Sequence, residues 1–169
     1  MSTVGSPLSA SALLQGASAT DAFAAALAPD LVAGDTLLLD GPVGAGKTAF
    51  ARGLLHSLMA RAKQPTEDVP SPTFTLVQTY QVGGLEVWHA DLYRVSGPDE
   101  VLELGLADAF ETALCLIEWP DRLGTDTPDH AITLRFAHAD AQARTLGIAG
   151  TGRLASAAHA ALASASAPP

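Results

Sequence analysis

The sequence predicts an α/β fold with a mixed sheet. Apolar runs of strand length alternate with segments of helical periodicity, which indicates strands and helices in succession. The pair Gly83-Gly84 joins two neighbouring β-rich runs as a hairpin, so one strand pair is antiparallel. The length of 169 residues corresponds to one domain. We expect a loosely ordered segment at 1–18, the domain at 19–164 and a tail at 165–169.

The first half of the chain predicts a strand flanked by two helices. Thr20 is expected to cap a helix over 21–28, which a proline ends. The apolar run TLLLD at 36–40 lies between two glycines and predicts a buried strand. Residues 48–62 place apolar side chains at helical spacing, and the proline-rich stretch at 64–72 predicts a loop.

The second half predicts more strands than helices. Its β-rich or apolar runs lie at 73–81, 85–90, 113–118, 132–136 and 145–148. A short helix is expected at 98–104, where acids precede apolar residues and a glycine follows. A last helix is expected in the Ala-rich stretch at 153–163.

Composition narrows the possible functions. Nine basic residues against eighteen acidic ones give a net charge of -9, which argues against broad nucleic-acid binding. The single cysteine, Cys115, lies in an apolar run, so we expect a core thiol in a reducing compartment. No apolar run reaches the ~18 residues of a membrane helix, and the N-terminus lacks the basic region of a signal peptide. We therefore expect a cytoplasmic protein without a membrane partner.

A phosphate-binding loop pattern, G-x-x-x-x-G-K-[ST], follows the strand expected at 36–40. Its residues are Gly41, Pro42, Val43, Gly44, Ala45, Gly46, Lys47 and Thr48. Glycines let backbone N–H groups converge on phosphate oxygens, and the following helix turns its positive end to the same anion. Lys47 would reach the outer phosphates and Thr48 would ligate magnesium. The alternative is a glycine-rich turn of no special function, but the strand before and the helix after favour the phosphate loop.

Two acids at strand ends are candidates for metal and water chemistry. Glu118 ends the run at 113–118 and would face the ligand crevice as a magnesium ligand; the alternative is a surface acid. Asp91 follows the run at 85–90 and would hold or orient water, with an Asx turn or helix cap as an equal alternative. His89 nearby is more often a packed, hydrogen-bonded residue than a catalytic one.

Three further features stay open from the residues alone. The segment at 71–75 favours an ordinary loop-to-strand junction over a nucleotide switch. Trp119 belongs either to the core or to a contact with ligand or partner. The string DRLG at 121–124 resembles the D-x-x-G element of GTPases, but the chain contains no Asn and so lacks the guanine-reading Asn-Lys-x-Asp element. We therefore expect ATP and not GTP.

Five pieces, in order and spacing, resemble the bacterial TsaE family of ATPases in tRNA threonylcarbamoyladenosine (t6A) biosynthesis. They are GPVGAGKT with AFARGLL after it, VPSPTFTLVQTY, HADLYR, the Glu-Leu-Gly stretch at 103–105, and CLIEWPDRL. The resemblance covers roughly residues 20–150. It implies a P-loop NTPase-like three-layer fold with a mixed, mostly parallel sheet. It also implies ATP, magnesium and a partner, the TsaD–TsaB threonylcarbamoyl transferase complex, through which tRNA is reached indirectly.

The resemblance also implies roles for single residues. Asp91, Lys47 and Glu118 would form the catalytic set, and Thr48 with Glu118 would hold the metal. Thr73 would belong to a switch-like loop that meets the nucleotide.

The resemblance also implies nucleotide contacts beyond the loop. Trp119 would lie close to the nucleotide, and Arg144 is the candidate for the family's late arginine, in a divergent C-terminal part. Contacts to adenine are expected near Ser18 to Thr20. Pro42-Val43 departs from the common acid-apolar pair, and Ala90 stands where an aromatic is common.

The function that follows is magnesium-dependent ATP hydrolysis, slow in isolation and faster on the partner complex, which hydrolysis would reset between rounds of transfer. No arginine is an obvious finger, and Arg94 and Arg122 are only candidates. One alternative is a small-molecule or nucleotide kinase, although the chain has no arginine-rich lid. Another is an interaction module in which ATP binding alone orders a surface.

Overall fold

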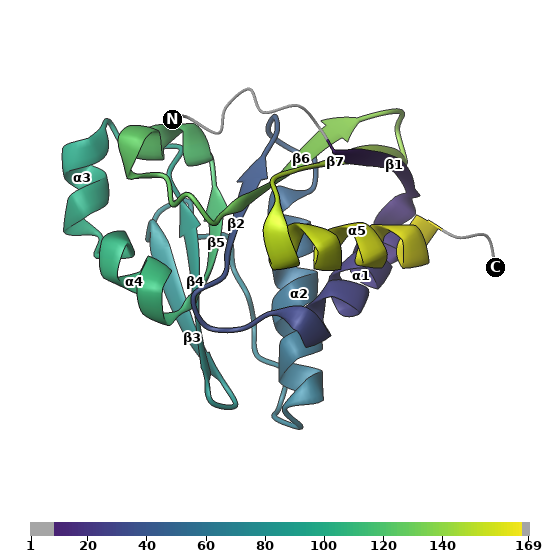
Figure 1. Ribbon diagram of the computed structural model, residues 1–169, viewed down its shortest axis with the longest axis horizontal. Coiled ribbons are helices and arrows are strands. Elements are labelled where there is room, and N and C mark those ends of the chain that lie inside the picture. Colours follow the sequence, from purple (N-terminus) through teal and green to yellow (C-terminus); the bar gives the residue numbers. More distant parts are fainter. Residues whose placement is uncertain (1–8, 167–169) are drawn as a thin grey trace.

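The computed structural model describes residues 9–166, which contain one seven-stranded sheet (Figure 1). The strands are β1 (Ala10–Gln15), β2 (Thr36–Asp40), β3 (Val77–Val82), β4 (Leu85–Asp91), β5 (Leu114–Glu118), β6 (Ile132–His138) and β7 (Ala143–Ala149). Their order is β1-β7-β6-β2-β5-β4-β3. Strands β6, β2, β5 and β4 run parallel, and the outer strands β1, β7 and β3 join antiparallel.

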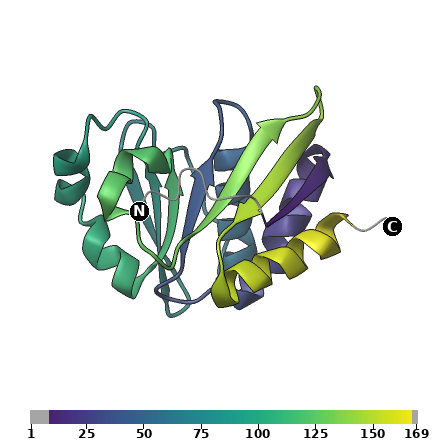
Figure 2. The same ribbon diagram turned by 45° about the horizontal axis from the view of Figure 1, so that its top comes forward.

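Helices cover both faces of the sheet (Figure 2). One layer holds α1 (Gly16–Leu27), the 3₁₀ turn η1 (Ala28–Asp30), α2 (Lys47–Arg61) and α5 (Gly152–Ser166). The other holds α3 (Pro98–Glu103), α4 (Leu106–Thr112) and the 3₁₀ segment η2 (Pro120–Asp126). Side chains of a strand alternate between faces, so Leu37 and Leu39 enter the first core and Leu38 the second. The expected three-layer fold with a mixed sheet is confirmed.

The parallel strands bring their carboxyl ends to one edge of the sheet. Leu39 of β2 is in register with Glu118 of β5, and Glu118 with Asp91 of β4. The loop at 41–48 therefore emerges beside both acids. This edge is where ligands bind in open α/β sheets.

Distinctive apolar runs gave the most accurate predictions. The strand expected at 36–40 is β2, and the run at 113–118 contains β5. The hairpin at Gly83-Gly84 and the helix expected at 48–62 are also confirmed, the helix as α2. Cys115 is fully buried, as expected, and burial raises the pKa of its thiol to about 12. Within residues 9–166, no helix is both long and apolar enough to span a bilayer.

The N-terminal expectations are wrong in two respects. Residues 10–15 form the edge strand β1, paired with β7, where a loosely ordered segment was expected; residues 1–8 lie outside the described part. Helix α1 begins at Gly16, so Thr20 lies buried inside it and does not cap it. Alanine-rich sequence extends the helix upstream, because Ala is the strongest helix former.

Two elements of the second half also differ from expectation. Residues 73–76 form turns, and β3 begins only at Val77. Leu76 adopts a left-handed backbone with φ 67°, and its N–H donates to the Pro72 carbonyl at 2.7 Å. Helix α4, beyond Gly105, was not expected. Of the predicted tail, only residues 165–166 are described, and they continue α5.

Candidate nucleotide-binding site

The loop between β2 and α2 wraps tightly because two of its glycines have backbones that other residues rarely adopt. Gly41 has φ 144° and Gly46 has φ 111°. A Cβ atom at Gly41 would lie 2.3 Å from the carbonyl oxygen of Phe136 on β6. Only glycine therefore lets the loop pass so close to β6, after which Lys47 begins α2.

Lys47 is nearly buried and turns back over this loop. Its Nζ donates to the carbonyl oxygens of Gly41 and, at 3.2 Å, Pro42. The same atom lies 3.8 Å from the ring centre of Trp119. Burial lowers the pKa of the ammonium group from its ordinary value, and nearby carboxylates, led by Glu118, oppose that shift. Lys47 is thus a cation held in place at the floor of the site.

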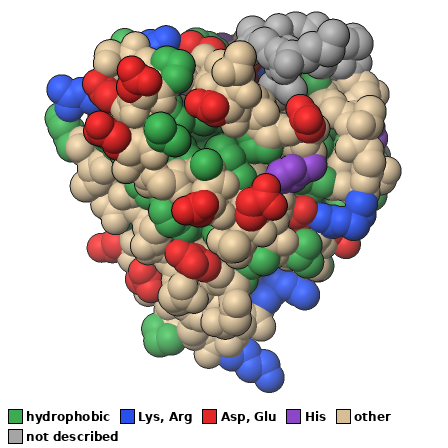
Figure 3. Space-filling view, turned by 60° about the vertical axis from the view of Figure 1, so that its left-hand side comes forward, with side chains coloured by type: hydrophobic (Ala, Val, Ile, Leu, Met, Phe, Trp, Pro, Cys, Tyr) green, Lys and Arg blue, Asp and Glu red, His purple; other side chains and the backbone are tan. Residues whose placement is uncertain are grey.

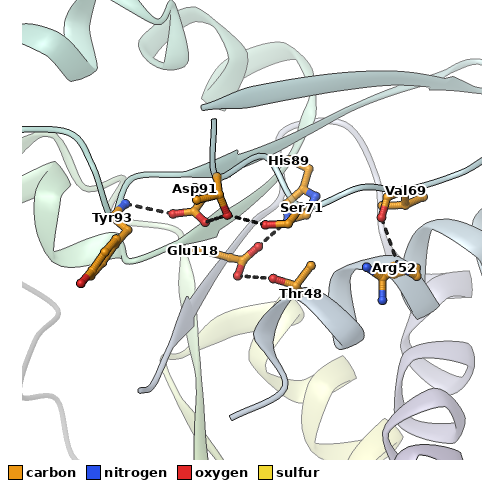
Figure 4. A network of polar contacts seen from close by, with 9 residues as sticks. Thr48, Arg52, Val69, Ser71, His89, Asp91, Tyr93 and Glu118 are labelled. Carbon is orange, nitrogen blue, oxygen red and sulfur yellow. Dashed lines mark hydrogen bonds and ion pairs between the residues drawn. The ribbon is translucent and has the colours of Figure 1, made fainter. Parts of the chain in front are cut away.

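Thr48, Glu118 and His89 form a continuous chain of contacts (Figure 4). The hydroxyl of Thr48 donates to Glu118 Oε1 at 2.8 Å, and His89 Nε2 meets Glu118 Oε2 at 2.7 Å. Glu118 and His89 are both buried. His89 Nδ1 has no hydrogen-bond partner among residues 9–166. The Glu118 carboxylate, at the end of β5, is therefore held by His89 of β4 and by Thr48 in the first turn of α2.

Asp91 is a second buried carboxylate beside this chain. Its Oδ1 accepts the N–H of Tyr93 at 2.9 Å, so the Asx turn considered from the sequence is present. Its Oδ2 lies 3.4 Å from the Thr73 hydroxyl, which is 2.7 Å from that of Ser71. Asp91 thus links β4 to the loop at 71–75. The Asx turn occupies only Oδ1, so Oδ2 is available for the contact with Thr73.

Helix α2 also holds the loop that carries Ser71 and Thr73. Arg52 Nε donates to the Val69 carbonyl at 3.1 Å, as Figure 4 shows, and His56 Nε2 lies 3.1 Å from the Glu67 carbonyl. The loop is therefore tied to the helix that starts at the phosphate loop.

Trp119 closes the site from the end of β5. Its backbone is left-handed, with φ 59°, which directs the chain sharply into η2. The ring packs against Tyr93, with centroids 4.8 Å apart, and against the Lys47 ammonium. Trp119 therefore lines the cleft with one side of its ring and also packs against the second core, so it has both a core and a site environment.

These side chains line one cleft of about 520 Å³. From the set singled out in the sequence, it brings together Val43, Gly44, Gly46, Lys47, Thr48, Thr73, Asp91, Glu118, Trp119 and Arg144. Gly41, Pro42 and Ala45 shape the loop without lining the cleft. Ser71 and Tyr93 also line it; Ser71 was considered only as part of the possible switch segment at 71–75, and sequence reasoning gave Tyr93 no role. The sequence pointed to them only by position, because Ser71 lies two residues before Thr73 and Tyr93 lies two residues after Asp91.

The arginines fall into two groups. Arg144 lines both this cleft and a smaller one of about 130 Å³, which Thr20 also lines and Ser18 does not. Arg94 lies over the Phe74 ring at 5.0 Å, and Arg122 pairs with its neighbour Asp121 at 3.0 Å. Neither Arg94 nor Arg122 lines the cleft.

The oxygen donors of the cleft suit a magnesium ion that arrives with phosphate. Within residues 9–166, no three His, Cys, Asp or Glu side chains are grouped to hold a metal ion. Magnesium commonly takes only one or two protein oxygens and completes its shell with phosphate and water. The Thr48 hydroxyl and the Glu118 carboxylate are such a pair.

Comparison with known proteins identifies the family. Residues 14–146 match the family model described as threonylcarbamoyl adenosine biosynthesis protein TsaE. The chain belongs to the TsaE family. The Rickettsia bellii TsaE protein is 37% identical over 114 residues, which are 68% of this chain and 76% of that protein. The Rickettsia felis TsaE protein is 39% identical over 102 residues, and the chain spans 57% of its length.

A solved structure has the same fold as this chain. The crystal structure of Bacillus subtilis YdiB superimposes with a TM-score of 0.69 and 25% sequence identity. The match covers 90% of this chain and 93% of that one. The fold described above is therefore shared with that structure over nearly the whole of both chains.

Proposed function

We propose that the protein is a magnesium-dependent ATPase that supports t6A modification of tRNA by binding and resetting a TsaD–TsaB-type transferase complex. The observation that carries this proposal is the direct bond from the phosphate-loop hydroxyl of Thr48 to the strand-end carboxylate of Glu118, with Asp91 in the same cleft. Membership of the TsaE family supports the pathway.

The phosphate loop would bind the nucleotide by charge and by backbone donors. The N-terminal end of α2 directs its free N–H groups toward the loop, where they favour an anion. Lys47 would exchange its bonds to the Gly41 and Pro42 carbonyls for the outer phosphate oxygens. The smaller cleft lined by Thr20 and Arg144 adjoins this site and would take the nucleoside.

Thr48 and Glu118 would hold magnesium, which offsets the charge of the phosphates when it is bound. His89 would keep Glu118 in place through its Nε2. Asp91 would orient the attacking water, because its carboxylate is buried in the cleft and the Thr73 hydroxyl approaches it from the opposite loop.

A slow basal rate follows from the positions of the arginines. Arg94 and Arg122 lie outside the cleft, and Arg144 donates to the adjacent Ala143 carbonyl at 3.2 Å. A partner that supplies or orders one cationic group would accelerate hydrolysis, since such groups contribute ~10³-fold or more in related chemistry.

The test is phosphate release from ATP by the protein alone and with TsaD–TsaB and tRNA. We expect stimulation by the partner mixture and its loss in both Lys47→Ala and Glu118→Gln. Glu67→Gln, on the exposed loop after α2, is the matched control and should behave as wild type. Turnover that ignores the partners would contradict the resetting role.

Two other results would redirect the assignment. Phosphate transferred from ATP to an added metabolite would make the protein a kinase. If Glu118→Gln still supported t6A formation while Lys47→Ala did not, ATP binding alone would suffice and the protein would be an interaction module.

A further inference from the structure

A second cleft, of about 370 Å³, lies on the other helical layer. It opens between α3, α4 and the stretch at 126–130 that follows η2, and it shares no lining residue with the nucleotide cleft. Figure 3 views this face and shows exposed hydrophobic side chains with acidic side chains around them. Its volume is in the range of cavities that bind ligands, about 300–1,000 Å³.

The floor of this cleft is apolar. Val101, Leu106 and Phe110 are buried at its base, and Leu102 stands on its edge with 68% of its surface exposed. Leu102 thus extends the apolar surface of the hollow to its edge. The base and the edge together form an apolar surface that can accommodate one large apolar side chain.

The rim of the cleft is acidic. Glu111, Asp126 and Asp129 are exposed at its edge, and no Lys, Arg or His within residues 9–166 forms an ion pair with any of them. Between residues 95 and 134 the sequence contains a single Lys or Arg, Arg122, which pairs with Asp121. The rim therefore presents unneutralised negative charge around an apolar centre.

We propose that this cleft is a docking site for a segment of a partner protein that carries a large apolar side chain flanked by lysine or arginine. The apolar side chain would fill the hollow over Leu106 and Phe110, and the flanking cations would meet the acidic rim. Nucleic acid and a second copy of this acidic chain are disfavoured by like charge. Residues 1–8 contain no Lys or Arg and do not match the rim either.

The site does not depend on the nucleotide chemistry proposed above. The stretch from Trp119 to Asp126 does join the two clefts along the chain, because Trp119 lines one and Asp126 the other. Lys47, however, lines only the nucleotide cleft, so a Lys47→Ala protein should still bind the partner segment. This expectation keeps the two proposals separable.

The test uses a fluorescein-labelled amphipathic peptide of leucine and lysine, followed by anisotropy with the full chain. A matched peptide with glutamate in place of lysine is the charge control. Leu102→Ser removes the exposed apolar contact, and the triple variant Glu111→Gln, Asp126→Asn, Asp129→Asn removes the rim charge. The triple variant Asp30→Asn, Glu67→Gln, Asp68→Asn makes the same change in net charge at exposed acids elsewhere.

We expect micromolar binding of the lysine peptide, weakened about tenfold or more by Leu102→Ser and by the rim triple variant, and unchanged by the control triple. Backbone NMR shifts should map to α3, α4 and 126–130. Absence of binding, equal loss in both triple variants, equal binding of the glutamate peptide, or shifts confined to the nucleotide cleft would each overturn the proposal. Thermal melts of each variant verify that it is folded.

Discussion

His89 is a buried residue whose side chain contacts the candidate metal ligand Glu118. Its Nε2 meets Glu118 Oε2, while Glu118 Oε1 accepts from Thr48. We predict that His89→Leu lowers kcat for ATP about 10- to 100-fold and raises the magnesium concentration needed for half-maximal rate, because Glu118 loses its orientation. Steady-state kinetics over a magnesium titration measures both.

His89→Gln is the matched control, because its side-chain amide also carries a donor. It should recover part of the rate and most of the magnesium affinity. If His89→Leu loses only thermal stability and keeps the magnesium dependence of wild type, the histidine is merely a packed residue.

Gly41 is the residue at which the loop leaves no space for a side chain. Gly41→Ala places a Cβ against the Phe136 carbonyl at a positive φ, so we expect a loss of about 3 kcal/mol of unfolding free energy together with loss of nucleotide binding. Urea unfolding measures the first. Gly84→Ala in the β3–β4 turn meets nothing within 4 Å and should change stability little. Equal unfolding midpoints in the two variants would refute the close approach.

At the scale of elements, α5 depends on small side chains for its packing. Ala155, Ala158 and Ala161 are buried against the same core as α1 and the sheet. We predict that Ala158→Leu costs about 2 kcal/mol of unfolding free energy through overpacking. Ala160→Leu, on the exposed side of the same helix, should stay within about 0.5 kcal/mol of wild type in the same chemical denaturation series. Similar costs at both positions would show that α5 is loosely packed.

The elements also show which parts of the fold a sequence can specify. TLLLD and LCLIE could be assigned because each is a continuous apolar run of strand length near turn residues, which favours a buried strand. ASALLQ and LADAFET are harder to assign, because both are short and interrupt their apolar residues with polar ones, and pairing with β7 decides the first case. Thr20 followed by an acid resembles a cap, but the alanines before it continue the helix.

In the candidate site too, the residues that could be predicted are those with a distinctive local sequence. Lys47, Thr48 and Glu118 could be predicted because a motif or a strand end fixes their positions along the chain. The contacts of Tyr93 and Ser71 could not, because they depend on left-handed backbones at Trp119 and Leu76. Such backbones are imposed by tertiary packing and leave no local pattern when the residue is not glycine.

At the scale of the whole molecule, Cys115 couples stability to pH. Its thiol has a pKa near 9 when exposed and about 12 in the folded chain, so the unfolded state loses its proton first. The stability that the buried thiol contributes is therefore complete below about pH 9 and is lost as pH rises toward 12. We predict that wild type loses about 1 kcal/mol more than Cys115→Ala between pH 8 and pH 10.

Denaturant unfolding at the two pH values measures that difference, and the comparison cancels other groups such as Tyr80, whose pKa burial also raises. Equal pH slopes in the two proteins would mean that water reaches the thiol in the folded state. At pH 8, thiol reagents should label Cys115 only as fast as the molecule opens, since the side chain is fully buried.

The contacts of Lys47 have a consequence for which anions the protein can distinguish. Two carbonyl oxygens and an indole face already surround the ammonium group, so they compete with any anion that enters. A singly charged ion would attract the ammonium group too weakly to replace both carbonyl oxygens and the indole. A polyphosphate would gain more, because it would also meet the N-terminus of α2. We therefore expect the loop to favour highly charged anions over the abundant small anions of the cell.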